Sequence, residues 1–131
     1  MIFGLAVTGA TTTYAATPQI ISEPSNGKII SIKAGSAFSI VLHSTYWQYD
    51  PLIATKAIQA TGQPVGARIA PGPTAPRACS HAGSGCGTVT WKFKAKSIGL
   101  ATITASRTSC GEALQCVGSQ GLYSVKIKVI R

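Results

Sequence analysis

The alternation of apolar and polar residues between Thr88 and Ala95 restricts the fold of this chain more than any other feature of its sequence. One set of side chains is apolar and the set between them is polar: Val89, Trp91 and Phe93 against Thr90, Lys92 and Lys94. A period of two is the repeat of a β-strand with one buried face. A slip of one residue would move every apolar side chain into water, so the pattern also fixes which face is buried.

The same alternation recurs in three further segments. Their apolar sets are Phe38, Ile40 and Leu42; Ala101, Ile103 and Ala105; and Tyr123, Val125, Ile127 and Val129. Lys28–Lys33 predicts another strand, and Leu52–Ala60 fits either a strand or a short helical turn. Four prolines make Thr61–Gly87 a long irregular segment. Short alternating strands without an amphipathic helix predict an all-β fold, an antiparallel β-sandwich.

Acidic residues are scarce, which excludes several kinds of enzyme. The 131 residues include 12 Lys and Arg but 3 Asp and Glu, for a formal net charge of +9. Glu23, Asp50 and Glu112 are far apart in the sequence, which disfavours a two-carboxylate hydrolase and a carboxylate metal site. Nucleotide and zinc-protease motifs such as GxGxxG, GxxxxGK[ST] and HExxH are missing. We expect a protein that is not an enzyme and has no cofactor.

The positive charge could indicate a nucleic-acid partner, but the strand pattern disfavours it. The strand lysines are expected to point outward, while Trp91 and Phe93 point into the core, so no exposed aromatic platform for base stacking is predicted. We expect no nucleic-acid binding. In an exported protein, the basic surface would better fit an anionic cell-envelope polymer or anionic lipid headgroups.

Residues 1–16 are similar to the second half of a secretory signal peptide. They are mostly apolar or small and end in Ala15-Ala16, although a basic first region is missing. We expect cleavage near Ala16 and one domain over residues 17–131, secreted to the exterior or to the cell envelope. An irregular N-terminus of a cytosolic protein is the alternative. No other segment approaches the roughly 20 apolar residues of a transmembrane segment.

All four cysteines lie in the second half of the chain, as Cys79 and Cys86 and then Cys110 and Cys116. An even number in an apparently exported chain predicts two disulfides. We favour the pairing of sequence neighbours, which would close two loops, but the two cross-pairings stay open. Zinc held by Cys79, His81 and Cys86 is a weaker alternative because CxxC repeats are missing.

The order of these segments resembles the chagasin family. A strand over Ile29–Lys33, a glycine turn, a strand over Ala37–Leu42 and an aromatic-rich loop come first. A glycine-rich segment, a strand ending at Arg107 and a last strand over Leu122–Ile130 follow. Chagasin-like proteins are immunoglobulin-like β-sandwiches that inhibit papain-type cysteine proteases by inserting three loops into the active-site cleft. Over residues 26–131 the resemblance therefore implies that fold and a protease partner.

Each of the three family loop motifs is altered in this chain. The first, Asn-Pro-Thr-Thr-Gly, is replaced by His43–Tyr49, in which Thr45 could substitute for the threonine that meets the catalytic cysteine. The second, Gly-x-Gly-Gly, corresponds to Gly83–Gly87, where Cys86 stands among the glycines. The third begins with Arg, Pro and an aromatic residue; Arg107 matches, but Thr108 and Ser109 follow it.

These loops supply the candidate partner-binding residues. They are Thr45, Tyr46, Trp47, Tyr49, Gly83, Gly85 and Arg107. We expect Trp47 to pack on the core and Tyr46 and Tyr49 to be freer to anchor a partner. Arg107 is either presented by its loop or is an ordinary exposed arginine paired with Glu112. The expected function is a secreted binding domain of chagasin type, and the alternative is a structural or cell-envelope interaction domain that keeps the fold but does not inhibit proteases.

Overall fold

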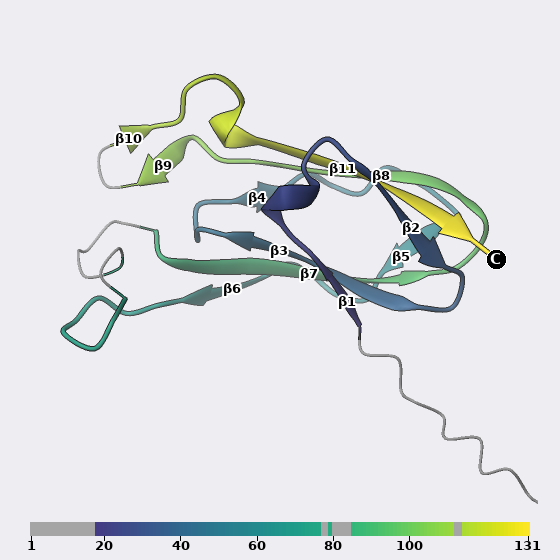
Figure 1. Cartoon of the computed structure of the whole chain (residues 1–131), viewed down its shortest axis with the longest axis horizontal. Helices are drawn as coiled ribbons and strands as arrows, with labels where there is room; N and C mark the ends of the chain where they lie inside the picture. Colours follow the sequence, from purple (N-terminus) through teal and green to yellow (C-terminus); the bar gives the residue numbers. More distant parts are fainter. Residues whose placement is uncertain (1–17, 77–78, 80–84, 112–113) are drawn as a thin grey trace, which may run out of the picture.

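The computed structural model describes residues 18–76, 79, 85–111 and 114–131, and in them the strands form two facing sheets (Figure 1). The first sheet contains, in order, β1 (Gln19–Ile21), β3 (Ala37–His43) and β7 (Gly87–Ala95), with β5 (Ile58–Ala60) and β6 (Val65–Arg68) both on the far edge of β7. The second sheet contains β2 (Ile29–Lys33), β11 (Leu122–Ile130), β8 (Gly99–Ser106) and β4 (Gln48–Tyr49). A hairpin of β9 (Ser109–Gly111) and β10 (Leu114–Gln115) and two 3-10 turns, η1 (Glu23–Ser25) and η3 (Gly118–Gly121), complete these elements.

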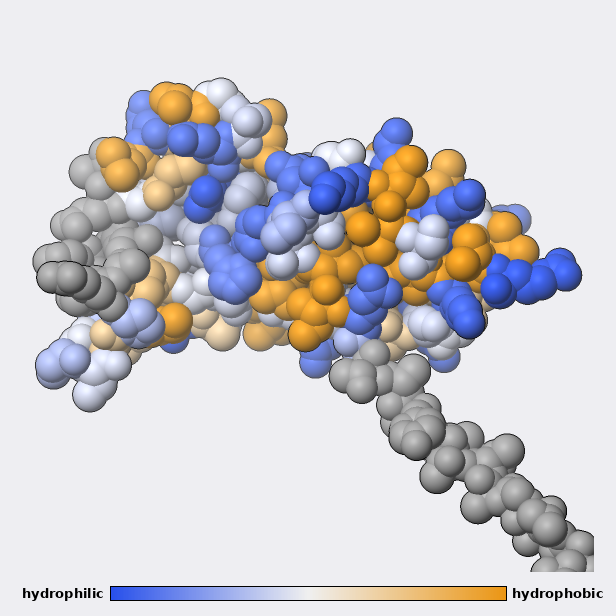
Figure 2. All heavy atoms as spheres, in the orientation of Figure 1, coloured by the Kyte–Doolittle hydropathy of each residue, from blue (hydrophilic) through white to orange (hydrophobic). Residues whose placement is uncertain are grey.

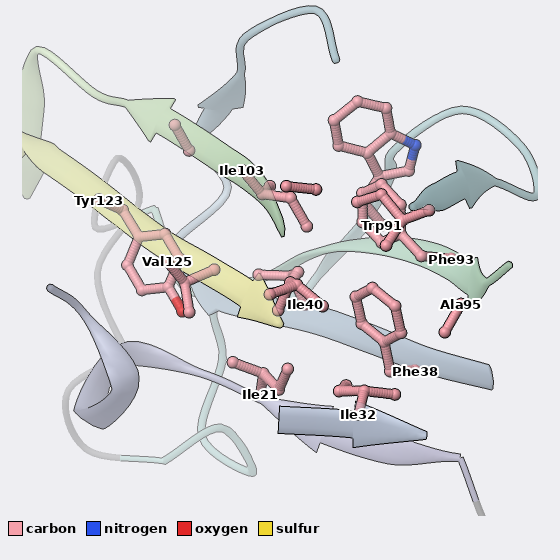
Figure 3. Packing of buried hydrophobic residues seen from close by; sticks show 14 of the residues in the cluster. Ile21, Ile32, Phe38, Ile40, Trp91, Phe93, Ala95, Ile103, Tyr123 and Val125 are labelled. Carbon is pink, nitrogen blue, oxygen red and sulfur yellow. The ribbon is translucent and has the colours of Figure 1, made fainter. Parts of the chain in front are cut away.

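The core lies between the sheets and is made by the alternating residues (Figure 3). In the antiparallel pair β3–β7, Phe38 lies opposite Phe93 and Ile40 opposite Trp91. In the pair β11–β8, Val125 lies opposite Ile103. Every apolar residue that the alternation assigned to the core is buried, and Lys92 and Lys94 are exposed, which confirms this part of the prediction. Thr90, expected to be exposed, is half-buried opposite β6, and Ser39, on the outward side of β3, is buried.

The N-terminal part of the described chain belongs to both sheets. β1 pairs in parallel with β3, and β2 pairs in parallel with β11. The chain passes from one sheet to the other at η1, which carries Pro24 in its first turn. All other pairings between the strands of the two sheets are antiparallel. The fold is therefore an all-β, immunoglobulin-like sandwich.

The segment between β4 and β7 differs from the sequence-based expectation. Within the ambiguous Leu52–Ala60, the structure has a strand only at β5. The segment expected to be irregular contains β6, whose Val65 lies opposite Thr90 and whose Arg68 lies opposite Gly87. All four β6 residues are exposed, so the strand is held by backbone pairing with β7 and leaves no apolar pattern in the sequence. The flanking Pro64 and Pro71 confine it to a short piece of the sheet edge.

Residues 1–16, where the signal peptide is expected, lie outside the described residues. Within the part of the chain that the structure describes, no helix has the length and apolar character needed to cross a bilayer.

Candidate functional site

Three loops meet at one end of the sandwich, on the side where β9 and β10 lie in Figure 1. The first loop, residues 44–47, follows β3; the second, residues 69–86, precedes β7; the third, residues 107–121, joins β8 to β11. His43 pairs with Thr88, and Ser106 pairs with both Leu122 and Gln48. These pairings place the start of each loop at the same end of the two sheets, which we call the loop end.

The first loop is fixed to the second by its backbone. The Ser44 N–H donates to the carbonyl of Gly87 (2.9 Å), and the Thr45 N–H donates to the carbonyl of Gly85 (2.8 Å). Ser44 has a φ of 131°, a conformation that residues with a side chain rarely adopt. Its hydroxyl accepts from the Tyr46 N–H at 3.2 Å. The strained turn is thus held by hydrogen bonds on both sides, and it presents Thr45 and Tyr46 against the second loop.

The Tyr46 ring leaves no room for a side chain at position 85, which is occupied by glycine. A Cβ at Gly85 would overlap the edge of that ring, and its φ of +70° is also unfavourable for other residues. Tyr46 is half-buried by this contact. The glycine character expected of the second loop therefore has a physical reason at Gly85, while Gly83 lies outside the described residues.

Trp47 packs into the core, as expected. Its side chain is 5% exposed, and its indole N–H donates to the carbonyl of His43 at 3.2 Å. Its ring lies edge-on to Tyr123, with 6.4 Å between the ring centroids. Trp47 therefore fixes the end of the first loop to the core.

Tyr49 does not have the exposed side chain expected from the sequence, so that expectation is wrong. Its hydroxyl lies 3.0 Å from the carbonyl oxygen of Ile40 and 2.9 Å from that of Val89, and these two oxygens share its one proton as acceptors. Burial, with smaller effects of Tyr123 and Glu23, raises the pKa of Tyr49. The hydroxyl of Tyr49 thus links β4 of the second sheet to β3 and β7 of the first.

Arg107 is half-buried and has defined partners at the loop end. Its guanidinium lies 4.6 Å from the centroid of the Trp47 ring, a cation–π geometry. Its Nε donates to the carbonyl of Gln120 at 3.2 Å, and its backbone N–H donates to Gly121 at 2.9 Å. The guanidinium is therefore held in place over the first loop. Its expected pairing with Glu112 falls outside the described residues.

Both disulfides join sequence neighbours and close the second and third loops. Cys79 and Cys86 are bonded, and so are Cys110 and Cys116. This confirms the local pairing and leaves no thiolate at Cys79 or Cys86 for zinc. Among the described residues, no group of His, Cys, Asp and Glu side chains could hold a metal ion.

A cleft of about 330 Å³ lies among the three loops. Its lining comes from all of them: Ser44, Ile69, Cys79, Gly85, Cys86, Gly87, Arg107 and Cys110, with His43 at the end of β3. In this way two disulfide-closed loops and one hydrogen-bonded loop form a single surface.

His43 and Glu23 form a hydrogen-bonded pair at the edge of this surface that the sequence did not indicate. The Glu23 carboxylate accepts from the His43 backbone N–H, and its Oε2 lies 2.9 Å from Nδ1 of the ring. Burial alone would raise the pKa of Glu23, but the hydrogen bonds from His43 outweigh it, and the pKa lies below its usual value. Twenty residues separate the partners in sequence, so no local pattern could reveal the pair.

The two sheets and the three-loop end together define a chagasin-like immunoglobulin sandwich. The solution structure of amebosin is similar to this chain with a TM-score of 0.54 and 14% identity, over 87% of this chain and 99% of that chain. The crystal structure of the cysteine protease inhibitor EhICP2 from Entamoeba histolytica is similar with a TM-score of 0.54 and 11% identity, over 86% and 94%. No protein-family model and no curated protein matches the sequence. At such identities the similarity establishes the fold.

Proposed function

We propose that this chain is a secreted, non-enzymatic binding domain that occupies the active-site cleft of a papain-type cysteine protease with its loop end. The observation that carries the proposal is that backbone hydrogen bonds and a cation–π contact join three loops at one end of a chagasin-like fold, while two disulfides close the second and third loops. A cysteine protease inhibitor is among the proteins with a similar fold. The two disulfides also support an oxidising compartment, and hence removal of residues 1–16 from a domain over residues 17–131.

The rigidity of the loop end supports binding as its role. Fixing loops in their bound conformation before association lowers the entropy lost on binding. Backbone strain such as that of Ser44 clusters at functional sites, because it persists only where the surroundings enforce it. The contacts would come from Thr45, Tyr46, Gly85 and the accessible part of Arg107, while Trp47 and Tyr49 support them from inside.

The first loop also implies selectivity among proteases. Tyr46 is bulky where the chagasin family has a small, threonine-bearing loop, so it would obstruct deep entry into a narrow cleft. We expect weak or no inhibition of papain itself and stronger inhibition of papain-type enzymes with a wider cleft.

An inhibition titration against a panel of papain-type proteases tests the proposal. For the enzymes that the domain inhibits most strongly, Tyr46→Ala should raise the inhibition constant roughly tenfold or more, as expected for an interface anchor. Arg107→Lys keeps the charge but loses the planar contact with Trp47, and it should weaken inhibition too. Lys33→Ala, at the opposite end, is the control and should change nothing.

Two outcomes would contradict the proposal. Inhibition that neither loop substitution affects would place the site elsewhere on the molecule. Absence of inhibition of every enzyme at micromolar concentration would favour the structural or envelope-interaction alternative. Thermal unfolding of each variant separates a lost contact from a lost fold.

A further inference from the structure

The end of the sandwich opposite the loops carries a cluster of cations. Its members are Lys33, Lys56, Lys94, Lys96, Lys128 and Arg131, all exposed, which we call the basic end. Backbone hydrogen bonds bring their segments together: Ala34 N–H to the carbonyl of Ile130 (2.7 Å), Gly35 N–H to Ala95 (2.8 Å) and Lys96 N–H to Ala57 (2.7 Å). Half of the chain's 12 basic residues therefore belong to one end of the molecule.

Acidic side chains do not neutralise the basic end. Glu23 is paired with His43 at the other end, and Asp50 accepts a hydrogen bond from the hydroxyl of Thr104 at 2.6 Å, toward the β4 side of the second sheet. The third acidic residue, Glu112, falls within the third loop by sequence. Among the described residues, none of the six cations of the basic end has a salt bridge. No acidic side chain of the described residues is therefore paired with these cations.

Two exposed aliphatic side chains stand among these cations. Ile98 and Leu100, in and beside the turn between β7 and β8, are each 63% exposed. Leu100 lies directly opposite Lys128 on the outer face of the second sheet, and Ile98 is two residues from Lys96. Figure 2 shows hydrophobic and hydrophilic surface side by side at this end, where Figure 1 marks the C-terminus.

We propose that the basic end docks on a bilayer that contains anionic lipids. Lysines near such a surface are attracted by its negative potential, which extends over about a Debye length. Ile98 and Leu100 would enter the boundary between headgroups and acyl chains, where apolar side chains leave water. A hydrated anionic polymer is a less suitable partner, because it offers no apolar environment for aliphatic side chains. A nucleic acid is less suitable too, because none of the described aromatic side chains is exposed for stacking on bases. The combination of charge and exposed aliphatics therefore favours lipid.

This orientation leaves the loop end free. β11 has nine residues, which span about 30 Å at the rise of a strand. The loop end lies at one end of this strand and the basic end at the other. Docking by the basic end would therefore hold the loop end about 30 Å from the membrane. The inference rests on other residues than the proposed protease binding and does not depend on it.

Cosedimentation with vesicles tests the inference. The folded protein should bind vesicles that contain phosphatidylserine, should bind pure phosphatidylcholine vesicles much less, and should be released by salt. Lys56→Gln together with Lys96→Gln should weaken binding about 25-fold, since each lysine near the surface is worth about fivefold. Lys28→Gln with Arg68→Gln is the matched control, because both residues are exposed outside the basic end; it should have a much smaller effect.

A second variant distinguishes lipid from other anionic partners. Ile98→Ser with Leu100→Ser removes no charge, and it should weaken vesicle binding at least fivefold while binding to polyphosphate stays unchanged. Equal losses in the Lys56/Lys96 and Lys28/Arg68 variants would overturn the inference, because net charge alone would then explain binding. So would vesicle binding that is unaffected by the two serines. All substituted side chains are exposed, and thermal unfolding checks that each variant keeps the fold.

Discussion

Gly85 shows how a single missing side chain can shape the loop end. The Tyr46 ring occupies the space that a Cβ at Gly85 would need, and the backbone there has a positive φ. We expect Gly85→Ala to lower the free energy of unfolding by about 1 kcal/mol or more and to displace Tyr46. Urea denaturation measures the first effect. Gly62→Ala is the matched control, because Gly62 has open space and no positive φ; an equal loss in both variants would contradict this account.

The hydrogen-bonded pair of Glu23 and His43 predicts a pH dependence of stability. The folded-state pKa of Glu23 lies below its usual value of 4.5, because hydrogen bonds from His43 outweigh the effect of burial. A lowered folded-state pKa stabilises the protein above the unfolded value, and this stabilisation is lost as pH falls through the folded pKa. We expect a steeper loss of stability below pH 4.5 in the wild type than in Glu23→Gln.

The size of this pH effect should be small. The Glu23 side chain is 38% exposed, so solvent screening limits the contribution to about 1 kcal/mol or less. Urea unfolding between pH 3 and 6 measures it. Identical pH profiles of the two proteins would show that the pair does not contribute.

At the scale of elements, the third loop depends on its disulfide. Cys110 lies in β9 and Cys116 directly follows β10, so their disulfide closes the β9–β10 hairpin, which would be marginal alone. Closing so short a loop contributes on the order of 2 kcal/mol in the chain-entropy model. We expect Cys110→Ala with Cys116→Ala to lower the free energy of unfolding by about that amount and to increase hydrogen exchange at β9 and β10 first.

The same double substitution at Cys79 and Cys86 provides the comparison. It should destabilise the protein by a similar amount but leave exchange in the β9–β10 hairpin unchanged. If the first variant loses no stability, the hairpin is held by its backbone bonds alone, such as that from Cys116 N–H to the carbonyl of Thr108 at 2.9 Å.

Long strands with one buried face could be predicted from the sequence, and short edge strands could not. β3, β7, β8 and β11 carry apolar residues at every second position, and these residues are buried. β3 departs from the period only at Ser39, which is buried between them. β6 has four exposed residues and is stabilised by the backbone of β7, which leaves no sequence pattern. β4 has two residues, too few to show a period, and for this reason the inward direction of Tyr49 was missed.

The loop end was predictable in outline only. The resemblance to the chagasin family implied three loops at one end, and the pairing of cysteines that are neighbours in sequence was favoured and is the one that the structure shows. The bond from Thr45 N–H to Gly85 and the contact of Arg107 with Trp47 join segments 40 and 60 residues apart. Such contacts depend on the packing of both sheets, so no local pattern encodes them.

At the scale of the whole molecule, the two proposed surfaces lie at opposite ends of the sandwich. Substitutions farther apart than about 10 Å, without shared partners, usually act independently. We therefore expect Tyr46→Ala to leave vesicle binding unchanged and Lys96→Gln to leave protease inhibition unchanged. Vesicle binding and protease inhibition can be measured in one assay, in which protease is added to vesicle-bound protein. A substantial effect of either variant on the other activity would show that the ends are coupled.

The parallel pairing of β2 with β11 has a mechanical consequence. Five residue pairs join these two strands, from Ile29 opposite Lys126 to Lys33 opposite Ile130. Tension between residue 18 and residue 131 acts first on β1, which is paired with β3. Once β1 is detached, the tension pulls β2 from its first residue and β11 from its last, in opposite directions, so it loads the hydrogen bonds between them together in shear. A domain with this connectivity should resist stretching along β2 and β11 far better than its free energy of unfolding suggests. Ile32→Pro removes a backbone donor from β2, and it should lower the force at which the two strands separate.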